Sequence, residues 1–220
     1  MRTKTLYPKI AGVLFLVAFI GAFSAPILSK LNVSTNLALD FAENKDSVLR
    51  ASVGLMIMGF ACAAIPVALY PILREKHPTS AIGSVVFRGI EGVFHLLISI
   101  CYILMSVVAQ KFSTAEAEPL LQVMLESIRT YVFVATIAWG IGAILYYYPL
   151  FKTKMLPCVI TVWGLVAMPL ALVGASLVFF LKMDSSAPVA LVLNIPIALQ
   201  EIAFAIWLII KGVKQTSNNR

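Results

Sequence analysis

Six long runs of apolar residues, separated by short polar segments, dominate the chain. They cover approximately residues 10–28, 52–73, 82–109, 131–151, 156–181 and 189–210. Each run can cross a hydrocarbon layer roughly 30 Å thick, at about 1.5 Å per helical residue. Because lipid offers no hydrogen-bond partner to bare backbone groups, each run is expected to be a helix. The pattern predicts an all-α fold, a polytopic bundle of six transmembrane helices, with residues 1–220 forming a single membrane domain.

The composition excludes most soluble classes of protein. Hydrophobic residues make up 60% of the chain and charged residues only 12%, with a mean hydropathy of +0.95. A soluble domain carries about 25% charged residues, so this chain has too little polar surface to coat a globule in water. The net charge of +7 does not indicate a nucleic-acid partner, because the basic residues lie in short loops between apolar runs. The expected surroundings are membrane lipid.

The basic residues are divided unevenly between the two sides of the predicted bundle. One side carries ten: Arg2, Lys4, Lys9, Arg74, Lys76, Lys152, Lys154, Lys211, Lys214 and Arg220. The other side carries six basic residues: Lys30, Lys45, Arg50, Lys111, Arg129 and Lys182. Most of the acidic residues lie on this second side as well. Because basic residues favour the cytoplasmic side, both termini are expected there, which agrees with an even number of spans. The first run has features of a signal peptide cut after Ser24, but its length favours retention as a span.

The two long connections, 29–51 and 110–130, both face outward in this topology. Their scattered apolar residues predict short helices lying on the outer surface. These residues are Leu37, Leu39, Phe41, Leu120, Leu121 and Leu125. The three tryptophans, Trp139, Trp163 and Trp207, and the tyrosines at 146–148 are interpreted as packing residues or interface anchors.

Four ionisable residues lie inside the predicted spans: Arg88, Glu91 and His95 in the third, and Glu201 in the sixth. Each charge in a membrane helix costs about 2.5–3.5 kcal/mol on insertion scales. At about 100° per residue, the polar side chains of the third span share an arc of roughly 80°. They are Ser84, Arg88, Glu91, His95, Ser99, Tyr102 and Ser106. This face is expected to point to the bundle interior or to a watery cleft.

Glu201 and Glu91 are predicted to lie at similar depths. Glu201 is roughly 15 Å and Glu91 roughly 13 Å from the cytoplasmic edge, at 1.5 Å per residue. We therefore expect Arg88 to contact Glu91, Glu201 or both, with Asn194 one heptad from Glu201 on nearly the same face. One arginine against two carboxylates leaves a deficit of one positive charge. A protonated His95, a proton held on a carboxyl group, or a bound cation could fill it.

Three interpretations of this cluster stay open. The first is a small-molecule, lipid or ion site formed by Arg88, Glu91, His95, Glu201 and Asn194. The second is a structural or assembly role in which the charges only fix helix order. The third is an intramembrane enzyme, including a metal-assisted one, because Glu91 and His95 are spaced i, i+4 and Glu201 could be a third ligand. No second histidine ligand lies in a span and no nucleotide-binding motif is present, so we expect no metal, no cofactor and no catalytic residue.

Several segments resemble a family of bacterial membrane proteins grouped as domain of unknown function 4386. The segment 87–91 matches its F-R-x-x-E, and the segment 195–212 matches its ending, P-x-x-x-x-E followed by A-x-W-L-x-x-K-G. Segments 10–16 and 156–164 are similar to its opening and to the start of its fifth helix. The resemblance implies a multi-pass protein of the bacterial inner membrane and implies no reaction. Arg88, Glu91 and Glu201 match the family's polar positions, whereas His95 lies outside its pattern.

Overall fold

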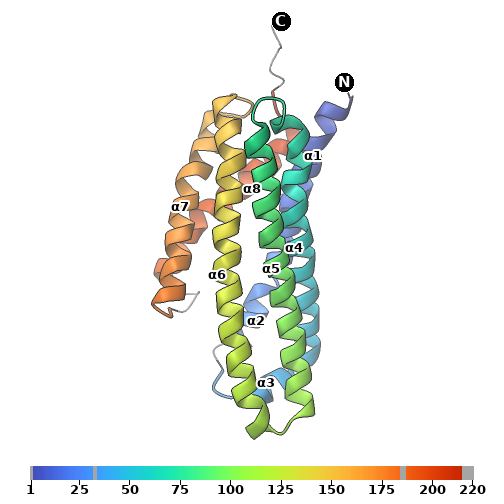
Figure 1. Cartoon of the computed structure of the whole chain (residues 1–220), viewed down its shortest axis with the longest axis vertical. Helices are drawn as coiled ribbons and strands as arrows, with labels where there is room; N and C mark the ends of the chain where they lie inside the picture. The colour runs from blue at the N-terminus through green and yellow to red at the C-terminus, as the bar shows by residue number, and fades with distance from the viewer. Residues whose placement is uncertain (1, 32–33, 184–186, 215–220) are drawn as a thin grey trace, which may run out of the picture.

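The computed structural model describes residues 2–31, 34–183 and 187–214, so Arg220 and the residue Asp184 of the predicted outer side lie outside the described residues. Eight helices are described, and no strand is present in these ranges (Figure 1). They are α1 Arg2–Ala22, α2 Ala25–Leu31, α3 Leu37–Glu43, α4 Lys45–Leu73, α5 Pro78–Lys111, α6 Thr114–Lys152, α7 Cys158–Phe180 and α8 Pro188–Ile210. The all-α prediction is confirmed.

Helices α4 to α8 are each long and apolar enough to cross a membrane, which makes the chain a multi-pass membrane protein by length and hydropathy. The apolar part of α1, Leu6–Ala22, is shorter. At about 1.5 Å per residue its 17 residues cover roughly 26 Å, somewhat less than the hydrocarbon thickness.

The first predicted span was expected to reach residue 28, and that boundary is wrong. Helix α1 ends at Ala22, and α2 begins at Ala25 after a turn at residues 23–24. The nitrogen of Pro26 carries no N–H to donate to the Ala22 carbonyl, and a proline is well tolerated in the first turn of a helix, where Pro26 stands in α2. The apolar run is therefore divided between two helices.

The six long helices form a ring in chain order. Helix α1 packs on α4, each following helix packs on the next, and α8 closes the ring against α1. The start of α1 and the end of α8 lie at the same end as the α4–α5 and α6–α7 turns (Figure 1). At that end the Lys214 N–H donates to the Met155 carbonyl at 2.9 Å, which fastens the segment after α8 to the α6–α7 turn.

The prediction of a separate surface helix within 110–130 is wrong. Helix α6 begins at Thr114 with a capping box between Ser113 and Glu116, and it continues unbroken to Lys152. Its 39 residues extend about 58 Å, far more than a membrane needs, so α5 and α6 project together beyond α7 (Figure 1). No helix-breaking residue separates residues 120–131, so nothing in the sequence ends the helix there.

The prediction of a short helix within 29–51 is correct, but this helix, α3, packs inward on the projecting part of α5 and α6. Leu37 and Phe41 are buried there with Leu121 and Leu125, while Leu39 and Leu120 are exposed. The Glu118 carboxylate of α6 accepts hydrogen bonds from the backbone N–H groups of Leu37 and Ala38, at 3.4 and 3.0 Å. A side chain from α6 thus caps the first turn of α3.

Two apolar clusters fill the bundle, one toward each end. The cluster near the termini includes Phe15, Leu69, Tyr147 and Phe204, and the cluster under α3 includes Phe41, Leu55, Tyr102 and Leu121. Along α5, the buried members of the two clusters are Ala81 on one side and Ile98, Tyr102 and Met105 on the other, so Arg88, Glu91 and His95 lie between them. The ionisable residues of α5 therefore lie at the level where the two clusters meet.

Helices α4 and α5 approach closely because glycines face each other. A Cβ added at Gly92 would lie 2.7 Å from the Gly59 carbonyl oxygen and 3.0 Å from the Ala63 Cβ, whereas one added at Gly89, on the same helix, would meet nothing within 4 Å. We expect Gly92→Ala to destabilise the fold by about 1–3 kcal/mol, the range for overpacked sites, and Gly89→Ala to leave stability unchanged or slightly higher. Thermal unfolding of both variants in detergent measures the difference, and equal melting temperatures would contradict the close contact.

Candidate functional site

The polar face of α5 is turned into the bundle, as its periodicity predicts. Ser84, Arg88, Glu91, Ser99, Tyr102 and Ser106 are all buried, and His95 is partly buried. Apolar residues of the same helix, including Val86, Val93 and Ile100, are exposed on the outer surface of the bundle. The Ser99 hydroxyl donates to the Ser52 carbonyl of α4 at 2.7 Å, so the face also joins neighbouring helices.

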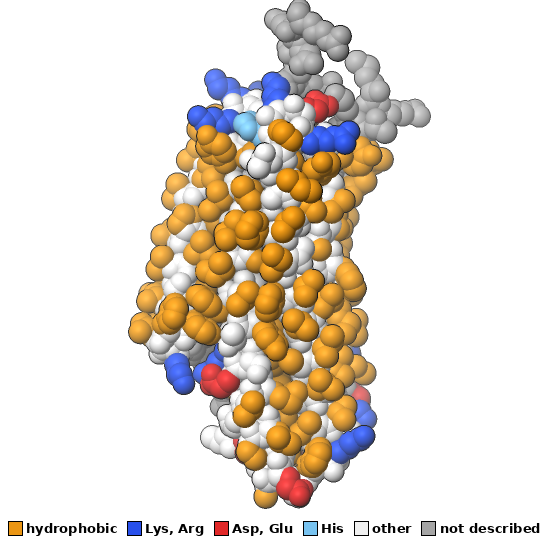
Figure 2. Space-filling model, viewed as in Figure 1, with side chains coloured by type: hydrophobic (Ala, Val, Ile, Leu, Met, Phe, Trp, Pro, Cys, Tyr) orange, Lys and Arg blue, Asp and Glu red, His pale blue; other side chains and the backbone are white. Residues whose placement is uncertain are grey.

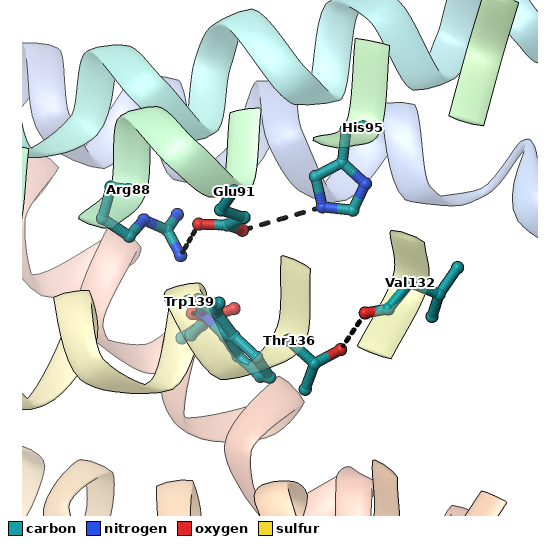
Figure 3. Close-up of polar contacts among 7 residues, drawn as sticks. Arg88, Glu91, His95, Val132, Thr136 and Trp139 are labelled. Carbon is teal, nitrogen blue, oxygen red and sulfur yellow. Dashed lines mark hydrogen bonds and ion pairs between the residues drawn. The ribbon is translucent and has the colours of Figure 1, made fainter. Parts of the chain in front are cut away.

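A cavity of about 270 Å³ lies against this face, at the level between the two apolar clusters. Helices α1, α4, α5, α6 and α8 line it. Its polar lining consists of Arg88, Glu91, His95, Thr136, Trp139, Asn194 and Glu201, so all five residues predicted from the sequence border one space. Figure 3 shows Arg88, Glu91 and His95 on one side of this region, and Thr136 and Trp139 of α6 on the other. The remaining walls are mostly apolar.

Arg88 and Glu91 form the predicted contact. Arg88 Nη1 lies 2.8 Å from Glu91 Oε2, and the two side chains are only 2% and 4% exposed. In the part of the chain that the structure describes, Arg88 Nε, Arg88 Nη1 and Glu91 Oε2 nevertheless have no hydrogen-bond partner. The two charges touch, but not along a hydrogen-bonding direction. His95 Nε2 lies 3.7 Å from the other oxygen, Glu91 Oε1 (Figure 3).

Helix α6 approaches Arg88 closely because residue 142 is glycine. A Cβ at this position would lie 2.8 Å from Arg88 Cγ and 3.1 Å from Arg88 Cδ. The aliphatic stem of Arg88 thus lies against bare backbone. This contact holds the stem of Arg88 between α5 and α6.

Glu201 contacts α6 instead of Arg88. Its Oε1 accepts a hydrogen bond from Trp139 Nε1 at 3.1 Å, and the described residues hold no Arg88–Glu201 ion pair. Of the two predicted contacts of Arg88, only the one with Glu91 is formed. Trp139 packs against the apolar cluster near the termini, as expected of a packing residue, and its indole also lines the cavity, which the sequence analysis did not predict. A signal was present: Ala135, Thr136 and Gly142 share its helix face and form a stripe of small residues.

Gln200, next to Glu201, belongs to a second polar group that the sequence analysis missed. It is fully buried, accepts a hydrogen bond from the Tyr147 hydroxyl at 2.7 Å, and donates to the Ile160 carbonyl at 3.0 Å. This group joins α6, α7 and α8 without bordering the cavity. Asn194, one heptad or about two turns before Glu201 on α8, donates to the Ala190 carbonyl at 2.8 Å and does line the cavity.

The cavity offers electrostatic and hydrogen-bonding chemistry to a bound molecule. In the described ranges, no three histidine, cysteine, aspartate or glutamate side chains gather closely enough to hold a metal ion. The third ligand suggested for a Glu91–His95 pair is therefore not assembled. The polar groups of the lining are one guanidinium, two carboxyl groups, one imidazole, the indole N–H of Trp139, the Thr136 hydroxyl and the Asn194 amide, set in mostly apolar surroundings.

The helical ring and its buried ion pair define a multi-pass membrane protein with a polar centre. The chain belongs to the family described as Domain of unknown function (DUF4386), whose model matches residues 10–212. This match covers most of the chain and includes Arg88, Glu91 and Glu201. No curated protein and no solved structure matches the chain.

The energetic weight of the Arg88–Glu91 pair can be measured by removing its positive half. We expect Arg88→Met to destabilise the protein by about 3–5 kcal/mol, because it leaves a buried carboxylate without a counter-charge. The double variant Arg88→Met, Glu91→Gln should regain most of this loss. Chemical unfolding followed by circular dichroism in detergent is the measurement.

The matched control is Arg129→Met. Arg129 pairs with Glu126 at 3.2 Å, also at i,i+3, but these side chains are 45% and 57% exposed. Its loss should cost less than about 1 kcal/mol. If both arginine variants lost the same stability, the buried pair would have no special weight.

Proposed function

We propose that this protein binds a small, partly apolar molecule in the cavity at the centre of its bundle, within the membrane. The observation that carries the proposal is the incomplete bonding of Arg88 and Glu91. Both side chains border the cavity and are almost fully buried. Arg88 Nε has no hydrogen-bond partner among the described residues, and Arg88 Nη1 and Glu91 Oε2 meet at 2.8 Å without hydrogen-bond geometry. Each unmade hydrogen bond of a buried polar group costs about 1–3 kcal/mol. A bound molecule that donates a hydrogen bond to Glu91 Oε2 would recover part of this cost.

The contrast with Gln200 supports a binding role over a purely structural one. The amide of Gln200 is bonded at both its oxygen and its nitrogen, to Tyr147 and to Ile160. Such a closed network is what fixing the helix order requires. The Arg88–Glu91–Glu201 group is instead open on the side of the cavity. The Gln200 group has its hydrogen bonds satisfied within the protein, whereas the Arg88–Glu91–Glu201 group does not. This difference is expected between a structural network and a binding site.

The size and walls of the cavity fit a small organic molecule. Its volume of about 270 Å³ lies near the lower end of small-molecule sites, which are roughly 300–1,000 Å³ and mostly apolar with a few polar groups. Among the described residues, one apolar cluster lies toward each end of the bundle from the cavity. If the molecule crosses the membrane here, helices around one cluster must separate. This arrangement favours a carrier over an open channel.

We further propose that the chain spans the bacterial inner membrane six times, with α1 as the first span and both termini in the cytoplasm. Figure 2 supports this orientation: lysine and arginine side chains gather at the end near the termini, and an apolar belt separates them from the opposite end, where acidic and basic side chains are mixed. The family match is the support for a bacterial membrane.

Alkaline phosphatase fusions, which are active only outside the cytoplasm, test this topology. We expect activity for fusions made after Ser34 and after Phe112, and none for a fusion after Lys76, in the α4–α5 turn. The fusion after Ser34 tests α1. An inactive fusion there would mean that α1 does not cross, and the number of spans would fall to five.

Binding can be measured through Trp139 itself. Three probes of one size and shape are used: 2-phenylethylammonium, 2-phenylethanol and phenylacetate. The full chain carries Trp163→Phe and Trp207→Phe, so that Trp139 is its remaining tryptophan. We expect at least one probe to change its fluorescence in a saturable manner in lipid nanodiscs. Ala198→Phe, which fills the cavity, should abolish the response.

The control for the cavity-filling variant is Leu199→Phe. Leu199 is the next residue of α8, but it is exposed and does not line the cavity. It should leave the response intact. The proposal would be wrong if no probe gave a saturable change, or if both phenylalanine variants behaved like the parent.

A further inference from the structure

We infer that the molecule bound in the cavity is an organic monocation, an ammonium group on a small apolar body, with the carboxylate of Glu201 as its counter-ion. This inference rests on the proposed function and specifies the chemical class of its ligand. The argument uses the charges that face the cavity, the atoms around Glu201 and the composition of the walls.

The charges that face the cavity do not balance. Arg88 and Glu91 neutralise each other at 2.8 Å. Glu201 has no cation within ion-pair distance in the described part of the chain, and it accepts a hydrogen bond from the neutral indole of Trp139. With an uncharged imidazole at His95, an ionised Glu201 leaves one negative charge in excess. A buried charge without a partner is costly, so a cation is the complementary guest.

The elements that surround Glu201 supply no second cation. Helix α1 contributes Phe15, Ala18, Phe19 and Ala22, and α4 contributes Met58, Cys62 and Ile65. On α5 the charged or titratable groups are Arg88, Glu91 and His95, and His95 Nε2 is directed at Glu91. The residues of helix α6 that line the cavity, Ala135, Thr136 and Trp139, carry no charge. The negative excess is therefore a property of the whole lining and not of α8 alone.

The walls favour an organic cation over a bare metal ion. Hard metal ions require about six oxygen ligands, and the cavity offers few oxygens near Glu201. The Thr136 hydroxyl already donates to the Val132 carbonyl at 2.8 Å (Figure 3). Phe15, Phe19, Met58, Ile65 and Ile197 present apolar surface instead. An ammonium carried on an apolar body matches both the single charge and these walls.

Trp139 strengthens the assignment because its indole lies beside the same carboxylate. The N–H end bonds Glu201 Oε1, and the ring borders the cavity. Aromatic faces attract cations by about 0.5–2 kcal/mol, more when water is excluded. An anion would meet the opposite situation, because Arg88 is already matched by Glu91 and two carboxylates would face it.

The three probes defined above separate charge preference from binding itself. In the parent protein we expect 2-phenylethylammonium to bind about tenfold more tightly than 2-phenylethanol, and phenylacetate to bind most weakly. Glu201→Gln keeps an acceptor for Trp139 but removes the charge. It should weaken binding of the ammonium about tenfold and leave the affinity for the alcohol within about twofold. The retained alcohol affinity also shows that the variant is folded.

Glu126→Gln is the matched control, because Glu126 is an exposed glutamate at the outer end of α6. It should change neither affinity. If the parent bound the alcohol and the ammonium equally, or if Glu201→Gln weakened both to the same extent, the charge assignment would be overturned while binding itself stood. Binding of no probe would instead contradict the proposed function. The comparison of the ammonium and alcohol affinities in the parent protein tests the charge assignment even if Glu201→Gln does not fold.

An inorganic cation is tested in the same assay. Sodium chloride is compared with N-methylglucamine chloride at equal ionic strength. We expect neither salt to change the Trp139 signal and both to affect ammonium binding equally. Selective competition by sodium, with its own saturable signal, would overturn the organic assignment.

Discussion

The cost of placing charge in hydrocarbon governs the arrangement of this bundle. A guanidinium and two carboxyl groups near the middle of the spans must be enclosed by neighbouring helices. The ring of α1 and α4 to α8 provides that enclosure, and the apolar outer surfaces of the helices are left for lipid. Small residues such as Gly59, Gly92 and Gly142 let the backbones come close enough to surround the charges. The close packing of the helices is therefore what allows the charged residues to be enclosed.

The sequence predicted the features that follow from the helical period within one helix. It missed those that depend on which neighbouring helix a side chain faces. A period of 3.6 residues is sufficient to place Arg88, Glu91 and His95 on one buried face, and the i,i+3 contact of Arg88 with Glu91 follows from that face alone. The depth of Glu201 was also informative, since it lines the same cavity. The position of a residue along its helix predicts its depth but not the neighbouring helix that its side chain faces. The Glu201 carboxylate accepts a hydrogen bond from Trp139 of α6.

The errors in the fold have a similar origin. Hydropathy marks where a chain is apolar enough for lipid, but it does not mark where a helix stops. Helix α6 therefore continues through residues that looked like a surface connection, because Leu121 and Leu125 are buried against α3 and nothing interrupts the backbone. Helix α1 ends early, before Pro26, whose nitrogen has no N–H to continue the helix, and hydropathy does not register this local property. The contact of Trp139 with Glu201 was not predicted, since tryptophan in a membrane protein is more often a packing residue or an interface anchor.

The contact of Arg88 with Glu91 has a consequence for biogenesis. Ribosomes deliver spans in order, so α5 reaches the translocon well before α8 has been synthesised. The two opposite charges lie one turn apart on a single helix, so each has its counter-ion from the moment α5 forms. The span can partition into lipid as a nearly neutral segment, at lower cost than two isolated charges. Glu201, by contrast, arrives last, when Trp139 is already in the bilayer to receive it.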